Sequence, residues 1–115
     1  MNKKEIYPKI KLYFESDEIF FGPGNADFLS LIDSLGSMQA ACKKMNMSYS
    51  KGWKMIKHME EKTGTTLVIR NTGGVHGGSS YLSDEAKRLV KAYNKLNNEL
   101  KKYSEKLRET YEEFL

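Results

Sequence analysis

The sequence predicts a single, mainly helical α+β domain, and three features of the 115-residue chain lead to this prediction. Apolar residues recur at helical spacing in four segments. Two short stretches alternate apolar and polar residues, as half-buried strands do. Residues 83–115 contain neither Gly nor Pro, which favours a long terminal helix. A chain of this length is typical of one domain with one core.

A β-hairpin is predicted over residues 9–21. Its first strand, residues 9–15, alternates between apolar and polar side chains. A polar turn at residues 16–18 and a short apolar run at residues 19–21 complete the hairpin. The side chains of the first strand that we expect to face the core are Ile10, Leu12 and Phe14.

Three helices are predicted after the hairpin. The first covers roughly residues 25–35, where apolar side chains fall at i, i+3, i+4 and i+7, and it ends at Gly36. Ser37 is the expected N-cap of a short second helix, and Ser48 is that of the third. Residues 37–63 therefore have the spacing of a helix-turn-helix, in which one helix braces a second that enters the major groove of DNA.

The predicted third helix has an apolar side and a basic side. Trp53, Ile56 and Met59 share the side that we expect to pack in the core. The other side combines hydroxyls, an aromatic ring and lysines near the outward-pointing N–H groups of the first turn. This pattern favours DNA contacts, although a generic amphipathic surface helix would look the same. The candidate DNA contacts here are Ser48, Tyr49, Ser50, Lys51, Lys54 and Lys57.

A second hairpin with a glycine-rich tip is predicted over residues 66–82. The stretch 65–70 is rich in β-branched residues, and Tyr81 and Leu82 form the return strand. Its tip can lay backbone N–H groups along phosphates or reach the minor groove as a wing, and a loose loop is the alternative. The candidate DNA contacts in this hairpin are Arg70, Gly73, Gly74, His76, Gly77 and Gly78.

The segment 83–115 predicts one long helix with an apolar seam. Ser83 is the expected N-cap, and Asp84 and Glu85 suit the positive end of the helix dipole. Apolar residues recur at alternating gaps of three and four, so the helix needs a partner surface. A second copy of the chain is the favoured partner, and packing on its own domain is the alternative. The candidate dimerisation residues are Leu89, Tyr93, Leu96, Leu100, Tyr103, Leu107 and Tyr111.

The net charge of +4 is unevenly distributed. Residues 1–36 carry a net charge of −2, and residues 83–115 carry +1. Residues 37–82 hold seven cations and two acids, a net charge of +5. A basic segment that coincides with the predicted helix-turn-helix and wing is what phosphate neutralisation requires.

The residue inventory argues against an enzyme, a metal protein and a membrane protein. Cys42, His58 and His76 lie on different predicted elements, without catalytic or zinc-ligand spacing. Ser79 follows Gly78 where a phosphate-binding loop needs lysine. No apolar run is long enough for a membrane span or a signal peptide. We therefore expect no cofactor, no metal, no membrane contact and a cytoplasmic location.

Several short motifs together carry a family likeness. They are Gly22-Pro23-Gly24, Gly36-Ser37, Ala40-Ala41, Ser48-Tyr49, Trp53, Leu67-Val68, Thr72-Gly73-Gly74 and Gly77-Gly78. With them the chain resembles the N-terminal winged-helix domain of molybdate-responsive (ModE-type) transcription regulators over about residues 8–95. More distantly, it is similar to the helix-turn-helix half of LysR-type regulators.

The resemblance implies dimeric binding to double-stranded DNA, with the third helix in the major groove and the wing beside it. It implies a winged helix-turn-helix domain at residues 1–82 and a dimerisation helix at 83–115 within the same domain. Full-length family members sense molybdate through C-terminal domains, so the likeness is to a single-domain form and assigns no molybdate site here. We expect a homodimeric DNA-binding transcription regulator. A protein-interaction adaptor that uses the long helix is the alternative.

Overall fold

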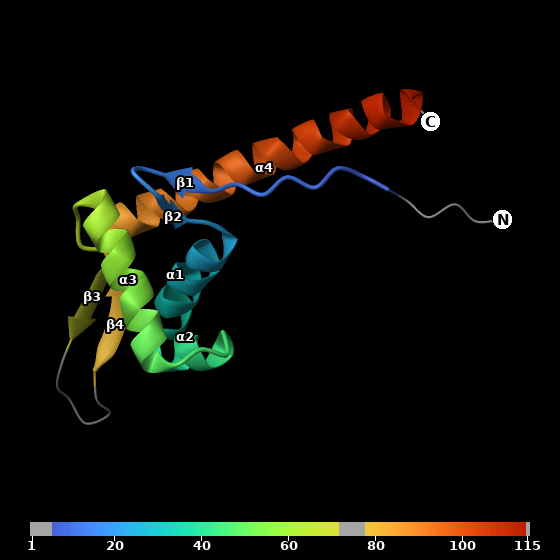
Figure 1. The fold of residues 1–115 in the computed structure, drawn as a ribbon. Helices are drawn as coiled ribbons and strands as arrows, with labels where there is room; N and C mark the ends of the chain where they lie inside the picture. The colour runs from blue at the N-terminus through green and yellow to red at the C-terminus, as the bar shows by residue number, and fades with distance from the viewer. Residues whose placement is uncertain (1–5, 72–77, 115) are drawn as a thin grey trace.

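The computed structural model describes residues 6–71 and 78–114 and has the predicted α+β architecture, with helices predominating (Figure 1). The helices are α1 (Pro23–Leu35), α2 (Met38–Lys44), α3 (Tyr49–Thr63) and α4 (Asp84–Glu113). The strands are β1 (Phe14–Glu15), β2 (Ile19–Phe21), β3 (Val68–Asn71) and β4 (Ser79–Leu82). Each strand pair forms its own antiparallel two-stranded sheet.

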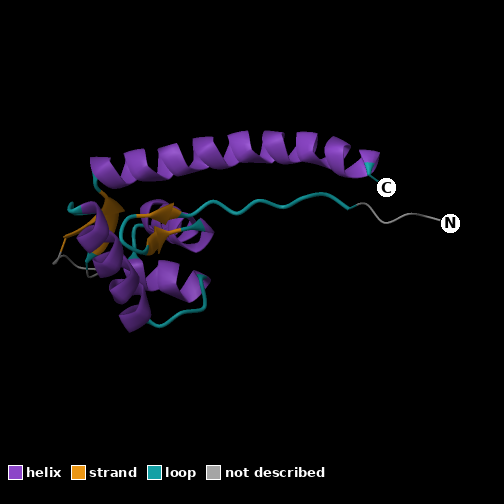
Figure 2. Cartoon of the chain, turned by 45° about the horizontal axis from the view of Figure 1, so that its top comes forward, coloured by secondary structure: helices purple, strands orange, loops and turns teal. Residues whose placement is uncertain are grey.

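The N-terminal hairpin is much shorter than the predicted 9–21. Strand pairing is limited to β1 and β2, because β2 has only three residues to offer as a partner. Residues before β1 instead run extended along α4 (Figure 2). The Ser104 hydroxyl donates a hydrogen bond to the Pro8 carbonyl, and the Tyr93 hydroxyl donates to the Leu12 carbonyl at 3.0 Å. The predicted alternation is nevertheless present: the side chains that are half-buried are Ile10, Leu12 and Phe14.

Serine N-caps begin three of the helices, as predicted. The hydroxyls of Ser37, Ser48 and Ser83 each accept a hydrogen bond of 3.1 Å from a backbone N–H in the first turn. The first helix begins earlier than predicted, at Pro23, because proline suits the first helical position. The Asn25 side chain closes this end by accepting from the Gly22 N–H at 2.9 Å.

Gly52 allows α2 and α3 to pack closely. A Cβ placed on it would lie 2.4 Å from the Cys42 sulfur and 3.0 Å from the Phe28 ring. Cys42 is buried and fills the space between the helices, as predicted, and burial raises the pKa of its thiol. The turn between the helices includes Asn46 at a φ of 54°, a left-handed conformation that asparagine tolerates. These features set the geometry of the helix-turn-helix.

One hydrophobic core joins all the helices, including the first half of α4. Tyr93 of α4 contacts Phe14 and Phe21 of the N-terminal hairpin edge-on, with ring centroids 5.5 and 5.3 Å apart. The largest side chains that are almost completely buried are Phe21, Phe28, Leu29, Ile32, Ile56, Met59, Leu67 and Tyr93.

The base of the second hairpin is attached to the helices on both sides. The Ser80 N–H donates to the Gly36 carbonyl at 2.9 Å, and the Leu82 N–H donates to the Asp33 carboxylate at 3.3 Å. On the other strand, the Glu60 carboxylate accepts from the Leu67 N–H at 2.8 Å. Because both strands are fixed at the base, the orientation of this wing follows from α1 and α3.

The far half of α4 projects beyond the core. The molecule measures 61 × 34 × 21 Å, and 30 helical residues rise about 45 Å. The wing lies at the opposite end of the molecule from the C-terminal end of α4 (Figures 1 and 2). The free end of α4 is accompanied only by the N-terminal segment among the parts of the chain that the structure describes.

Candidate nucleic-acid interface

The basic side of α3 is exposed over its first two and a half turns. Lys51, Lys54 and Lys57 all have exposed side chains, as does Ser50. The Ser48 hydroxyl already accepts a hydrogen bond from the Lys51 N–H as the N-cap. The helix therefore offers three ammonium groups to a ligand, while Ser48 shapes the helix start.

Arg70 at the base of the wing is held against α3 by two aromatic side chains. Its guanidinium carbon lies 4.0 Å from the centroid of the Trp53 ring, and Nη1 donates to the Tyr49 hydroxyl at 3.3 Å. Tyr49 in turn meets Trp53 edge-on, with ring centroids 6.2 Å apart. Stacking and hydrogen bonding together fix the direction of an otherwise flexible guanidinium.

The prediction that Trp53 packs in the core is met only in part, because its ring packs against the core but stays half-buried. Ile56 and Met59 are buried, but Trp53 is only half-buried, because it lies at the edge of the apolar side of α3 next to the wing. Periodicity places a residue on a side of a helix, and it does not locate the edge of that side. The Trp53 ring supports Arg70 at the junction of α3 and β3.

A polar hollow of about 550 Å³ opens between the start of α2, the start of α3 and the wing. Tyr49 and Arg70 lie on one of its walls, and Gln39 of α2 also lines it. Gly78 is exposed at its rim. The arrangement brings together predicted contacts from both the helix and the wing: Tyr49, Arg70 and Gly78.

The predicted contacts at the wing tip are Gly73, Gly74, His76 and Gly77, and they lie outside the described residues.

Acidic residues of the N-terminal hairpin bind the last turns of α3. Lys62 Nζ lies 2.9 Å from an Asp17 oxygen, and 3.5 Å from the Glu18 carboxylate. His58 Nε2 lies 2.5 Å from Glu18 Oε1. The partnership with Lys62 lowers the pKa of Asp17, and the His58 contact together with Lys62 lowers that of Glu18.

The ion pairs with Asp17 and Glu18 raise the pKa of Lys62. His58 therefore contacts the N-terminal hairpin through Glu18. The exposed basic side of α3 ends near Lys57.

The predicted dimerisation residues fall into two groups along α4. Tyr93 is 2% exposed and belongs to the monomer's own core, so it has almost no surface left for a second copy. Leu89 also packs against this core. Farther along, Leu96 and Tyr103 are exposed, at 43% and 55%. The candidates that are half-buried are Leu100, Leu107 and Tyr111.

Neither a metal site nor a membrane span is found in the described ranges. No cluster of three or more His, Cys, Asp or Glu side chains is placed to hold a metal ion there. None of the described helices is both long and apolar enough to cross a membrane.

Comparison with known proteins identifies the helix-turn-helix. Residues 28–77 match the family described as bacterial regulatory helix-turn-helix protein, lysR family. The transcriptional regulator ModE of Haemophilus influenzae is 33% identical over 96 residues, which cover 84% of this chain and 36% of that protein. The chain contains a ModE-type helix-turn-helix domain. The DNA-binding transcriptional dual regulator ModE of Escherichia coli K12 is 32% identical over 92 residues, or 80% of this chain and 34% of that protein.

The ModE-type domain spans about a third of the length of these relatives. The molybdenum-pterin-binding protein MopB of Rhodobacter capsulatus is also similar, with 28% identity over 63% of this chain and 27% of that protein. The crystal structure of ArgP from Mycobacterium tuberculosis superposes with a TM-score of 0.56 at 19% identity, covering 77% of this chain and 31% of that one. This likeness supports the fold class of the ModE-type domain.

Proposed function

We propose that the chain is a transcription regulator that binds duplex DNA as a homodimer, with α3 in the major groove and the wing alongside. The observation that carries the proposal is the Arg70 guanidinium, held by Trp53 and Tyr49 beside the exposed lysines of α3. Exposed cations and hydroxyls of α3 and of the wing are thereby available for phosphate contacts and groove contacts.

The electrostatics of α3 support this orientation. Lys62 is already paired with hairpin acids, whereas Lys51, Lys54 and Lys57 have no ion pair among the described residues. A duplex would meet free ammonium groups at the beginning and middle of α3, and a helix that reads bases does so with its N-terminal part. Counterion release from DNA would then drive much of the affinity.

The part of α4 from Leu96 onward supports a dimer. Leu96, Tyr103 and the C-cap residue Phe114 are exposed and fall on one stripe, at about 100° per residue. Such a stripe is stable in water when a second helix covers it. Two copies paired in this way would present two α3 helices to half-sites one helical turn apart, or a multiple of a turn.

The direct test measures how affinity for duplex DNA depends on salt. Duplexes selected from a randomised library with the native chain would be labelled and titrated by fluorescence anisotropy. If a dimer neutralises about six to eight phosphates, log affinity falls with log salt at a slope of about −5 to −7. The substitution Lys54→Ala removes one contact per protomer, so we expect weaker binding and a slope shallower by about 2.

Lys102→Ala is the matched control, because Lys102 is an exposed lysine near the free end of α4. We expect the control to bind DNA as the native chain does. A flat salt response, or equal losses in the two variants, would contradict the proposal and favour the adaptor alternative, for which DNA contacts at α3 have no role.

A further inference from the structure

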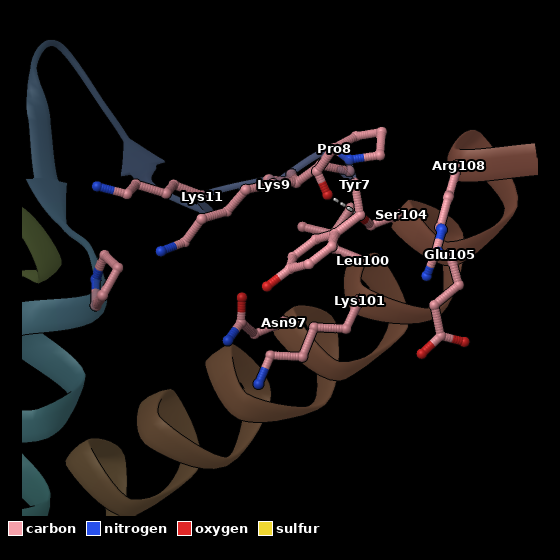
Figure 3. A pocket seen from close by; sticks show the side chains of 12 residues that line it. Tyr7, Pro8, Lys9, Lys11, Asn97, Leu100, Lys101, Ser104, Glu105 and Arg108 are labelled. Carbon is pink, nitrogen blue, oxygen red and sulfur yellow. Dashed lines mark hydrogen bonds between the residues drawn. The ribbon is translucent and has the colours of Figure 1, made fainter. Parts of the chain in front are cut away.

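A groove lies between the N-terminal segment and α4 beyond the core (Figure 3). Its volume is about 650 Å³, within the range of roughly 300–1,000 Å³ typical of small-molecule sites. Residues 7–11 form one wall, α4 forms the other, and Pro23 also lines it. It shares no lining residue with the hollow between α3 and the wing.

The lining of this groove combines apolar surface with an excess of positive charge. Apolar surface comes from the N-terminal segment, from Pro23 and from Leu100 of α4. The only acidic residue among the described lining residues is Glu105. The cations that line the groove are Lys9, Lys11, Lys101 and Arg108. Arg108 is paired with Glu112 at 3.0 Å, so the surplus positive charge comes from the three lysines. An apolar wall with these lysines complements a ligand that has an apolar body and a negative charge.

The side chains drawn in Figure 3 are arranged for such a ligand. The Tyr7 hydroxyl, the Asn97 amide and the Lys9 ammonium group project toward the opening between the walls, whereas the Glu105 carboxylate points away from it. Donors and a cation therefore converge on one region beside the Tyr7 ring.

The backbone of the N-terminal wall adds further donors. Hydrogen bonds tie this segment to α4 at Pro8 and at Leu12. Between these two ties, the N–H groups of residues 9–11 have no hydrogen-bond partner within the described ranges. The segment is thus anchored at two points, with donors between them.

The groove lies on a different side of α4 from the exposed apolar stripe. At about 100° per residue, Asn97, Lys101 and Arg108 lie roughly 100–140° around the helix from Leu96, whereas Leu100 lies only about 40° from it. A ligand in the groove and a second copy on the stripe would therefore use different sides of α4 that adjoin at Leu100.

We propose that this groove is a binding site for a small organic anion with an apolar body, held jointly by residues 7–11 and α4. The anionic group lies near Lys9, with Lys101 on the α4 wall of the groove, and the apolar body lies against Tyr7, Ile10 and Leu100. The proposal is independent of DNA binding, because it rests on residues outside the helix-turn-helix and its test contains no DNA.

The test uses anilinonaphthalene sulfonate (ANS), a fluorescent organic anion with an apolar body, titrated into the full chain. We expect saturable binding at one site per chain. Lys101→Glu should weaken the binding about tenfold, because it replaces an attractive charge in the lining of the groove with a repulsive one. Lys102→Glu is the matched control, since Lys102 is an exposed neighbour that does not line the groove, and its affinity should stay within twofold.

Tryptic cleavage locates the bound probe. Lys9 and Lys11 are exposed cleavage sites in the N-terminal wall, and saturating ANS should slow cleavage there but not at Lys54 on α3. Circular dichroism melting of both charge variants checks that they fold. Equal affinities of Lys101→Glu and Lys102→Glu, absence of protection at Lys9 and Lys11, or equally tight binding of uncharged N-phenylnaphthylamine would each overturn the proposal.

Discussion

Gly52 lies where α2 and α3 approach each other most closely, with the Cys42 sulfur directly opposite. The glycine sits inside a helix, where it costs about 1 kcal/mol relative to alanine. Close packing of the two helices outweighs that cost. This contact could have been predicted from the sequence. Gly52 is a glycine within the predicted third helix, and the predicted second helix contains small residues such as Cys42.

The substitution Gly52→Ala should destabilise the domain by about 1–3 kcal/mol, because the added methyl group overlaps the Cys42 sulfur. Urea unfolding measures the effect. In the background of Cys42→Ala, which removes the sulfur, the cost of Gly52→Ala should fall. Gly24→Ala is the control, since no atom lies within 4 Å of a Cβ at that position in α1. A loss of stability in the control as large as that in Gly52→Ala would contradict this explanation.

The Trp53 ring stacks on the Arg70 guanidinium and so stabilises the junction of α3 and the wing. Since Trp53 is half-buried, Trp53→Ala should leave the domain folded and cost about 2 kcal/mol, less than the roughly 3–5 kcal/mol typical of a fully buried aromatic. A double-mutant cycle of Trp53→Ala and Arg70→Ala should give a coupling energy of about 0.5–1 kcal/mol in unfolding experiments. Trp53→Phe keeps a ring under the guanidinium and should retain part of that coupling. A coupling energy of zero would mean that the stack contributes nothing.

At the scale of elements, the acidic turn between β1 and β2 clamps the last turns of α3. Asp17 and Glu18 have lowered pKa values in the folded chain, so their contribution to stability is complete above their ordinary pKa and is lost as the pH falls through the lowered one. Because the pKa of Lys62 is raised, its contribution to stability is present at and below its ordinary pKa. This contribution is lost only at strongly alkaline pH.

Asp17→Asn should therefore be less stable than the native chain at pH 7, and the difference should shrink below about pH 4 and be lost as the pH falls through the lowered pKa of Asp17. Urea unfolding at a series of pH values measures it. Glu15→Gln is the control on the same hairpin, because Glu15 has no ion pair in the described part of the chain. A difference that persists unchanged at pH 3 would show that the Asp17 charge is not the cause.

The N-terminal segment shows how one element depends on another. Residues 9–13 alternate as a strand does, yet no strand pairs with them within residues 6–71 and 78–114, and they lie along α4 instead. Alternation reports that one side of an extended chain is buried, and it does not report what buries it. The serine caps, by contrast, were predicted at the right residues because capping depends only on atoms within one turn.

At the scale of the whole molecule, α4 has two roles along one apolar seam. Its beginning completes the core through Ala86 and Tyr93, and the part from Leu96 onward has Leu96 and Tyr103 exposed. The heptad pattern is the same in both parts, so it could not separate them. Tyr93 is buried because the core contacts only the beginning of α4. The later apolar positions extend past the core and stay exposed, where a second copy could cover them.

The double substitution Leu96→Glu/Tyr103→Glu should abolish the proposed dimer while leaving the fold intact, because both side chains are exposed in the monomer. Sedimentation velocity measures the oligomeric state, and thermal melting checks the fold. The control, Lys95→Glu/Lys102→Glu, changes exposed lysines of the same helix and should still dimerise. A native chain that sediments as a monomer at all concentrations would contradict the dimer, and so would a double variant that still dimerises.

By itself the sequence determined the fold class, the serine-capped helices, the helix-turn-helix spacing and the basic segment. Each of these depends on side-chain periodicity, on charge or on atoms within a single turn. Only the tertiary structure decided three contacts. Trp53 stacks on Arg70, the acidic residues of the hairpin pair with Lys62 and His58, and Tyr93 is buried in the core. Those outcomes depend on which elements meet, and contacts between residues distant in the chain leave no periodic pattern in the sequence.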